Sequence, residues 1–361
     1  MRTIFLSLLL ITFIALTSPG SLSGEIRLLE RLEVDPSQSQ LFFPRDFCLT
    51  EDGLFLISDQ YAREVKIYQL EGKTLKLVGT IGGANATEGR LQYPTYCFYN
   101  PEQSRFGVID FDKKAILLYD RLNRLDFKYD QAIDCPHLAD GIQLIGNTLW
   151  VSGYTPDTRN NPYDLYAIDL SSYRKTFLMP SYLKYGLKSL AEYEEKYMNS
   201  LDIRALGISG WFSVQGDYVY FAWEGDLRII KMDRQTGRLQ PFSGITRTSS
   251  RYVRPYFSEQ MRNGYRNRDA QVILKEKDKM AFVKHLFTDS GHVYVVYQGP
   301  VTQNPRFRVQ IYTLNGDRVD DTAIPDKPGD PMWLDKETGF LYSIGQKPGG
   351  NGFVILRYDI R

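Results

Sequence analysis

A repeated pattern of short strands constrains the fold of this chain more than any other feature of its sequence. In residues 57–70 (ISDQYAREVKIYQL) an apolar run ends at Asp59, a charged turn follows, and alternation of apolar and polar residues resumes. Residues 108–120 (VIDFDKKAILLYD) repeat this order, with Asp110 in the place of Asp59. Apolar alternation on both sides of a polar turn predicts paired antiparallel strands. An acid that recurs in consecutive copies predicts a structural acceptor of backbone N–H bonds rather than a catalyst.

Four more degenerate copies follow along the chain. Each reads as strand, tight turn, strand, longer loop and strand, at residues 141–170, 211–233, 286–314 and 332–360. Polar turns with Gly, Asn or Asp join the first two strands of most copies, as at Asp52-Gly53 and Gly216-Asp217. Six copies of one unit predict an all-β fold, a six-bladed β-propeller, because a sandwich shows no repeat at this period. The alternating residues 25–34 are expected to form the outer strand of the last blade.

The two clearest copies resemble NHL-type repeats. Residues 43–70 and 93–120 each open with an aromatic residue and a proline, pass a small turn, and end a strand at an acid before an aromatic residue closes the next strand. The Gly-rich residues 81–94 (IGGANATEGRLQYP) are similar to the lead that precedes the proline in such repeats. The resemblance covers residues 41–120 and implies a six-bladed propeller.

The first 24 residues have the layout of a secretory signal peptide. Arg2 precedes an apolar run over residues 4–16, and small and turn-forming residues follow. An uncleaved membrane anchor is the alternative, but the run is shorter than the roughly 20 residues that span a bilayer. We therefore expect a secreted or periplasmic propeller over residues 25–361, with no stable membrane insertion after cleavage, and a monomer.

Charge and cysteine content exclude some classes of protein. The chain has 44 basic and 43 acidic residues, and loss of Arg2 with the leader leaves the two signs equal. A neutral chain argues against a nucleic-acid-binding protein, which needs a broad basic field. The three cysteines are too few for a disulfide scaffold. Cys48 and Cys97 lie in apolar strands, where buried thiols are expected and a disulfide is the alternative.

Two insertions interrupt the repeat, and both follow an outer strand. Residues 181–205 have apolar residues at helical spacing, which predicts an amphipathic helix packed on the propeller, with a mobile lid as the alternative. Residues 244–283 interleave arginines, Arg251 and Arg254 among them, with aromatic residues. Guanidinium groups beside rings bind carboxylates, phosphates or stacked rings, although a solvated surface loop is equally consistent. Both insertions are predicted on the face where the inner strands begin, which is called here the opening face.

The residues predicted at the inner-strand beginnings give the candidate ligand site. With the arginines of the second insertion, the predicted ligand-binding set is Arg45, Tyr96, His137, Asp140, Trp211, Arg251, Arg254 and His285. No catalytic motif is present, so no catalytic or metal-binding residue is assigned, and no cofactor is identified.

The leading hypothesis is an exported binding protein for a small anionic or aromatic ligand, or for an envelope or extracellular protein. The alternative is a metal-dependent lactonase-like hydrolase or lyase that uses His137, Asp140 and His285. That alternative rests on the resemblance to propeller enzymes that hold a metal on the axis. A structural scaffold in a cell-envelope assembly is a third hypothesis.

Overall fold

The computed structural model describes most of the repeat region. The described residues are 26–35, 41–135, 138–154, 163–180, 210–223, 229–242, 260, 263–264, 267, 269–279, 281–300, 302, 307–325, 332–336, 338–347 and 352–360. The expected signal peptide, the first predicted insertion at residues 181–205, His137, Arg251 and Arg254 lie outside these residues.

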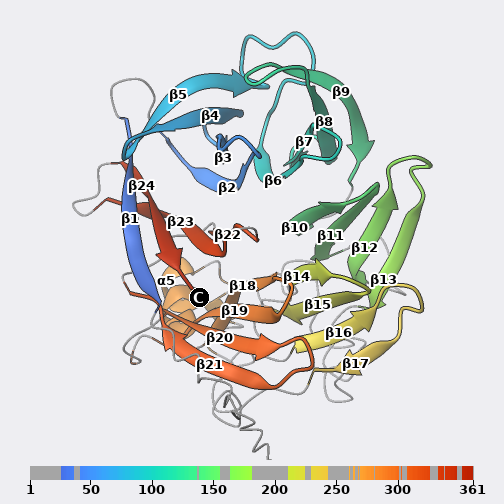
Figure 1. The fold of residues 1–361 in the computed structure, drawn as a ribbon, viewed down its shortest axis with the longest axis vertical. Helices are drawn as coiled ribbons and strands as arrows, with labels where there is room; N and C mark the ends of the chain where they lie inside the picture. Colours follow the sequence, from blue (N-terminus) through green and yellow to red (C-terminus); the bar gives the residue numbers. More distant parts are fainter. Residues whose placement is uncertain are drawn as a thin grey trace, which may run out of the picture.

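The described strands form five hydrogen-bonded sheets (Figure 1). Four of them contain four antiparallel strands each. These are β6 (Pro94–Asn100), β7 (Arg105–Asp110), β8 (Ala115–Arg121) and β9 (Phe127–Asp134); β10 (Leu138–Ile145), β11 (Thr148–Tyr154), β12 (Tyr163–Asp169) and β13 (Lys175–Pro180); β14 (Gly210–Gln215), β15 (Tyr218–Trp223), β16 (Ile229–Asp233) and β17 (Leu239–Pro241); and β18 (Phe282–Thr288), β19 (His292–Gln298), β20 (Phe307–Thr313) and β21 (Arg318–Ala323).

The fifth sheet has eight strands and contains both the first and the last copy of the repeat. Its order is β2 (Pro44–Leu49), β3 (Phe55–Asp59), β4 (Glu64–Glu71), β5 (Thr74–Ile81), β1 (Arg27–Val34), β24 (Phe353–Asp359), β23 (Phe340–Gln346) and β22 (Met332–Leu334). β1 pairs antiparallel with β24, as predicted for residues 25–34. It also meets β5 in parallel through two residue pairs, so the beginning of the chain joins its end.

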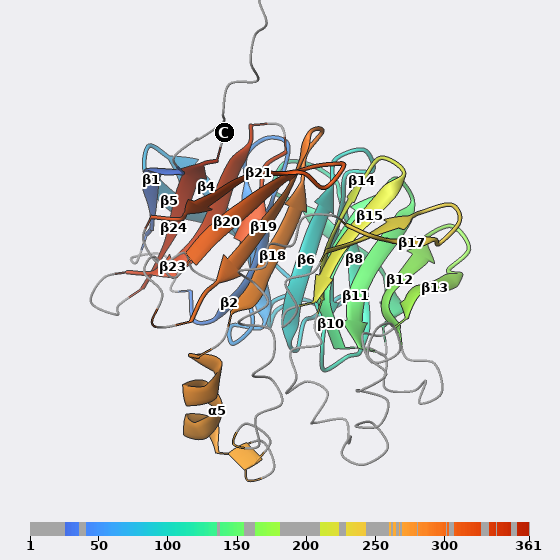
Figure 2. The same cartoon turned by 90° about the horizontal axis from the view of Figure 1, so that it is seen from below.

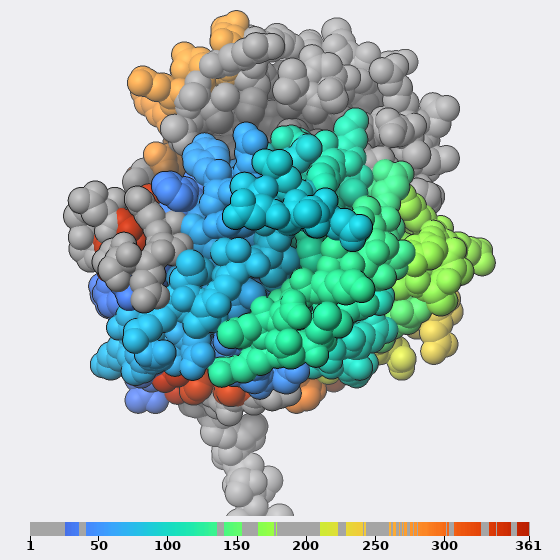
Figure 3. All heavy atoms as spheres, turned by 90° about the horizontal axis from the view of Figure 1, so that it is seen from above, coloured from blue at the N-terminus to red at the C-terminus, as the bar shows by residue number. Residues whose placement is uncertain are grey.

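The sheets stand around a common axis, with the first strand of each copy innermost (Figure 1). Contacts between inner strands run from β22 to β2, β6, β10, β14 and β18 in turn. Figure 3 shows the outer side, where the atoms of the first copy in blue lie against those of the second copy in teal and green. This arrangement brings the beginnings of the inner strands, which are far apart in the sequence, to one end of the axis.

Buried aromatic residues fill the spaces between neighbouring sheets. The third strand of most copies carries a tyrosine with at most 2% of its surface exposed. These are Tyr68, Tyr119, Tyr166, Tyr312 and Tyr358. One apolar cluster joins Cys48 and Leu56 of the first copy to Cys97 and Val108 of the second. The core is therefore shared between sheets, and each sheet needs its neighbour to bury its faces.

Asp59 and Asp110 have the same structural role in consecutive copies. Both are fully buried. Asp59 accepts the backbone N–H groups of Phe42 at 2.8 Å and Phe43 at 3.0 Å, and Asp110 accepts those of Gln92 and Tyr93 at 2.6 and 3.1 Å. Weaker bonds come from the following turns, as the sequence predicted. The shorter bonds, which were not predicted from the sequence, tie the residues just before each inner strand to the acid at the end of the second strand.

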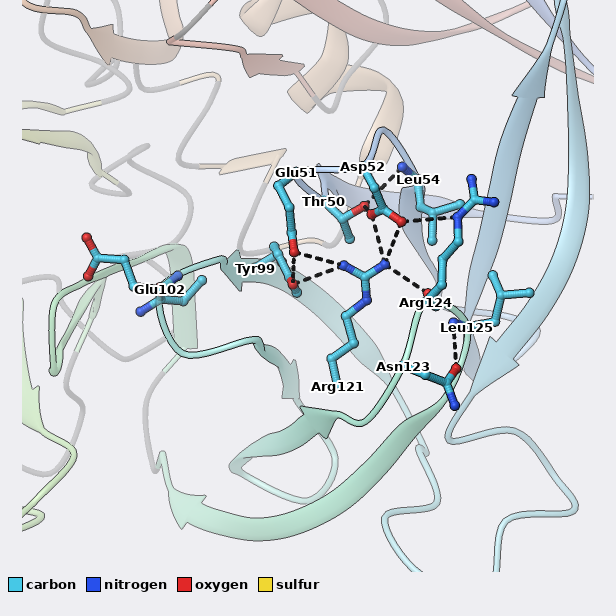
Figure 4. Close-up of polar contacts among 11 residues, drawn as sticks. Thr50, Glu51, Asp52, Leu54, Tyr99, Glu102, Arg121, Asn123, Arg124 and Leu125 are labelled. Carbon is cyan, nitrogen blue, oxygen red and sulfur yellow. Dashed lines mark hydrogen bonds and ion pairs between the residues drawn. The ribbon is translucent and has the colours of Figure 1, made fainter.

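A polar cluster joins the first two copies on the face opposite to the opening face (Figure 4). Arg121 at the end of β8 pairs with both carboxylate oxygens of Asp52 at 2.8 Å, and its side chain is only 7% exposed. Its other nitrogen donates to Glu51 and to the hydroxyl of Tyr99. Arg124 adds a bond to Asp52 at 3.1 Å. One guanidinium nitrogen thus contacts both carboxylate oxygens, and with Arg124 as a further donor the network is stronger than an isolated surface pair.

The described part of the second predicted insertion contains a short helix, α5 (Ala270–Lys277). Figure 2 shows α5 standing off the ring of sheets, on the side from which the chain enters β18. The sequence did not predict this helix, because arginine and aromatic residues dominate the insertion. β18 begins at Phe282, so the last residues of the predicted range 244–283 belong to an inner strand instead.

All three cysteines are buried free thiols. The sulfur atoms of Cys48 on β2 and Cys97 on β6 lie 3.9 Å apart. Burial, with the neighbouring Cys48 thiol, raises the pKa of Cys97 well above its usual value. Cys135 lies 3.2 Å from the hydroxyl of Tyr166. Cys48 and Cys97 therefore pack as small apolar residues, as expected from their apolar strands.

Candidate functional site

The opening face has an irregular backbone where four inner strands begin. The pairing register shifts between Pro44 and Asp46, between Pro94 and Cys97, between Ala139 and Gly141, and between Val283 and His285. β-bulges of this kind redirect a side chain and are common beside functional sites. The displaced residues are Arg45, Thr95, Tyr96, Asp140 and Lys284. Arg45, Tyr96 and Asp140 among them belong to the predicted ligand-binding set.

An aromatic group forms where β14 and β18 begin. The rings of Trp211 and His285 lie 4.2 Å apart between centroids, and the ring of Phe287 stacks on His285 at 5.4 Å with an interplanar angle of 4°. His285 is 5% exposed, whereas Trp211 is half-buried. The structure therefore brings together two of the predicted ligand-binding residues from neighbouring sheets.

Two donors at the strand beginnings have no acceptor among the described residues. These are the Nε atom of Arg45, whose guanidinium lies 5.6 Å from the centre of the Phe43 ring, and the indole nitrogen of Trp211. Unpartnered buried donors are uncommon, and each calls for an explanation such as a bound acceptor. The indole nitrogen of Trp150 on β11 is also unpartnered. An unpartnered donor alone therefore does not indicate a binding site. Arg45 and Trp211 are candidates because they also lie where inner strands begin.

The other predicted residues contribute less to this group. Tyr96 packs against the apolar cluster between the second and third copies. The backbone of Asp140 is described and bulged, but its side chain lies outside the described part, as do His137, Arg251 and Arg254. Three predicted residues, Arg45, Trp211 and His285, are thus described on inner strands of the opening face, and we call these three the axial entrance. Trp211 contacts His285, whereas Arg45 lies on β2 of another sheet and Tyr96 packs in the apolar cluster.

The described residues do not support a metal centre. No three His, Cys, Asp or Glu side chains among them are grouped so that they would hold a metal ion. Asp46, which lies beside Arg45, accepts the backbone N–H of Cys97 at 2.9 Å and so connects β2 to β6. His285 packs with aromatic rings. These contacts give both residues a structural role.

A second feature of the opening face was not predicted from the sequence. Phe43 stacks on Tyr61 with ring centroids 5.0 Å apart, and Tyr93 lies 5.7 Å from Phe111. Phe42 adjoins the first pair and is 55% exposed. The signal was present, because both clear copies have an aromatic residue before the proline and another just after the buried acid. We name Phe42, Phe43, Tyr61, Tyr93 and Phe111 the aromatic rim.

Among the described residues, no helix is long and apolar enough to cross a membrane.

Comparison with known proteins identifies a fold but no family. No family model matches the chain, and no curated protein matches it. A solved member of the DUF4221 family from Bacteroides vulgatus aligns with a TM-score of 0.60 at 10% identity, covering 92% of this chain and 98% of its own. A protein described as exported, from Bacteroides fragilis, aligns with a TM-score of 0.56 at 13% identity over 95% and 98% of the two chains.

A calcium-binding protein, regucalcin from Agrobacterium tumefaciens, aligns with a TM-score of 0.51 at 10% identity over 92% and 96% of the two chains. Identities this low carry no information about ligand or activity. Together with the sheets described above, these likenesses show a β-propeller-like, all-β fold.

Proposed function

We propose that this chain is an exported six-bladed propeller that binds a small anionic ligand at the axial entrance and performs no chemistry of its own. The blade count follows from dividing the eight-stranded sheet at its short parallel contact between β1 and β5. That division leaves six units of four strands, each corresponding to one copy of the repeat. On this reading the first two units are NHL-like repeats.

The observation that carries the proposal is the pair of unpartnered donors at the axial entrance. An anionic ligand at the end of the axis would offer separate carboxylate or phosphate oxygens to the Nε of Arg45 and to the indole N–H of Trp211, and charge-assisted bonds of this kind are strong. The Trp211 and His285 rings would contact an apolar or aromatic portion of the same ligand. Lys284, displaced by the bulge in β18, adds a second cation near the axis.

Export is proposed from the leader-like residues 1–24, which lie outside the described part. A protein partner at the same place and a scaffold role in a cell envelope remain the alternatives within the binding class. The metal-dependent hydrolase would need His137, Asp140 and His285 to converge. Of these three side chains, only that of His285 is described, and it packs between Trp211 and Phe287.

Calorimetric titration tests this proposal. The purified chain is titrated with acetate, succinate, citrate, benzoate and inorganic phosphate. We expect at least one of these anions to bind, and to bind about tenfold or more weakly to Arg45→Gln and Trp211→Phe, since a lost charge-assisted bond costs about 1.5–3 kcal/mol. Trp150→Phe is the matched control, because it removes another unpartnered indole N–H on β11. Unchanged binding in Arg45→Gln, or no binding of any anion, would reject the axial entrance as an anion site.

The enzyme alternative has its own readout. The chain is incubated with calcium and zinc, desalted and measured for bound metal. Stoichiometric metal that is lost in His285→Ala but not in His292→Ala would favour the hydrolase or lyase over the binding protein. His292 is a suitable control because it follows the turn on the opposite face, where it lies beside Asp289.

A further inference from the structure

The aromatic rim consists of two ring pairs at the beginnings of neighbouring inner strands, and its Phe43 adjoins Arg45 of the axial entrance. The exposed fractions are 55% for Phe42, 38% for Phe43, 68% for Tyr61 and 36% for Phe111, and Tyr93 completes the second pair. Large apolar side chains that gather on a surface mark interaction sites, whereas isolated ones need no explanation. Here the rings gather in two pairs at equivalent places of neighbouring sheets.

The backbone that carries these rings is fixed in place. Asp59 binds the N–H groups of Phe42 and Phe43, and Asp110 binds that of Tyr93. The two inner strands are tied together as well, because the hydroxyl of Ser58 donates to the carbonyl of Thr95 at 2.5 Å. Because this backbone is already ordered, binding a partner costs little conformational entropy here.

The loops of the rim also carry cations without ion-pair partners. Arg63, Arg90, Lys113 and Lys114 are exposed and form no ion pair among the described residues. The acids of the same loops, Glu64, Glu88 and Asp112, are fewer, and Glu64 lies 3.9 Å from the buried Lys66. Exposed unpaired cations beside rings favour a partner with negative charge.

The shape of this face favours a polypeptide over a membrane. Figure 2 shows α5 projecting beyond the ring of sheets on the side where β18 begins. A flat bilayer would meet α5 before it reached the bases of the loops that hold the rings. A narrow peptide segment can pass beside α5 and lie along two neighbouring sheets.

We propose that the aromatic rim is a docking surface for an acidic polypeptide segment that inserts aromatic or aliphatic side chains beside its ring pairs. The Phe43–Tyr61 and Tyr93–Phe111 pairs contact these apolar anchors, and the cations of the surrounding loops bind Asp and Glu residues on either side of them. Aromatic residues in the centre of such a surface contribute most of the binding energy. Phe43 of the rim lies beside Arg45, but the inference does not depend on the anion site, because none of the rim residues donates to that ligand and the variants that test the rim leave Arg45 unchanged.

The experiment is a selection of random peptides of about a dozen residues, displayed on phage, against the purified full chain. We expect selected peptides to be enriched in Asp and Glu next to Trp, Phe or Leu. A synthetic peptide with the consensus sequence should bind Tyr61→Ser at least about tenfold more weakly. It should also bind the Lys113→Glu/Lys114→Glu variant more weakly, with smaller salt dependence.

Tyr173→Ser is the matched control, since Tyr173 is also an exposed tyrosine, 47% accessible, but follows β12. The thermal transition of each variant shows whether it is folded. No enrichment, enrichment in basic peptides, or equal binding by Tyr61→Ser would overturn the proposal. Co-sedimentation with phosphatidylcholine–phosphatidylserine vesicles that Tyr61→Ser abolishes would also overturn it, in favour of a membrane surface.

Discussion

The buried carboxylate of Asp59 accepts the backbone N–H of Phe43 at 3.0 Å, and so joins the end of the second strand to the residue before the first. The same bond recurs one copy later between Asp110 and Tyr93 at 3.1 Å. In both copies the acid therefore holds an aromatic residue at the beginning of an inner strand, exposed at Phe43 and half-buried at Tyr93. Each buried acid thus fixes the position of a residue of the aromatic rim, where docking of a partner is proposed.

Replacement of Asp59 should cost more stability than replacement of Asp110. Lys66, which is 3% exposed, pairs with Asp59 at 3.0 Å, so Asp59→Asn leaves a buried ammonium group without its main partner. We expect a loss of about 3–5 kcal/mol for Asp59→Asn, the usual effect of breaking a buried pair. Asp110→Asn, which removes acceptors of backbone N–H groups only, should cost about 1–3 kcal/mol.

Unfolding in urea measures both losses. The double variant Asp59→Asn/Lys66→Met should recover part of the stability, because it removes the stranded charge as well. Equal losses of unfolding free energy in Asp59→Asn and Asp110→Asn would show that the ion pair between Asp59 and Lys66 contributes little to stability.

The Asp52 cluster should make the folded state sensitive to acid. Burial alone would raise the pKa of Asp52, but hydrogen bonds from Thr50 and Arg121 and the charge of Arg121 lower it below its ordinary value of 3.8. A carboxyl with a lowered folded-state pKa stabilises the fold fully above pH 3.8, and the stabilisation disappears as the pH falls through the folded-state pKa.

Stability of wild type and Asp52→Asn is compared by urea unfolding from neutral pH down to the acid range. The variant should be less stable at neutral pH, and the difference should shrink below pH 3.8. Asp112→Asn is the control, because Asp112 is exposed in a turn and forms no ion pair among the described residues. A difference that stays constant with pH would contradict the assignment of this cluster.

Gly210 leaves no room for a side chain beside the axial entrance. A Cβ atom at this position would lie 1.9 Å from Cζ of Phe221. Gly210→Ala should therefore destabilise the chain by about 1–3 kcal/mol, as overpacking does, and shift the fluorescence of the adjacent Trp211. Gly291→Ala is the control, since the nearest atom to a Cβ there is Asp289 Oδ1 at 3.8 Å. If Gly210→Ala matched wild type in both properties, the close packing of Phe221 against Gly210 would be wrong.

The cysteines should react only when the chain unfolds. Cys48 and Cys97 are buried, and the raised pKa of Cys97 suppresses the reactive thiolate. Ellman's reagent should therefore detect no thiol in the native chain and all three in denaturant. Intact mass before and after reduction provides the second readout. A mass that rises by two hydrogens on reduction would show a disulfide and contradict the free-thiol structure.

Much of the fold was predictable because each copy of the repeat has a local pattern of alternating apolar residues and polar turns. The buried tyrosines that end third strands, such as Tyr68 and Tyr119, recur at a fixed distance from a buried acid. Residues 25–34 were placed correctly because a ring of sheets needs a strand to close it. The short helix α5 has only eight residues and no strong apolar periodicity, so no local pattern predicted it.

The candidate site was less predictable. The bulge that displaces Arg45 depends on pairing between strands, and no local pattern encodes it. The contact of Trp211 with His285 joins residues more than 70 positions apart and follows only from the arrangement of two sheets. Phe43 and Tyr61 were visible in the repeat, but their exposure was not, because aromatic residues near strand ends are buried as often as they are displayed.

The indole N–H signals of the tryptophans test the central claim most directly. The chain has four tryptophans, at positions 150, 211, 223 and 333, so that ¹⁵N-tryptophan labelling should give four indole resonances, each assignable with a Trp→Phe variant. During titration with the anion that binds most tightly, we predict a large downfield shift of the Trp211 signal, which Arg45→Gln abolishes. A titration in which Trp211 stays unmoved while Trp150 or Trp333 shifts, or in which no indole signal moves, would contradict it.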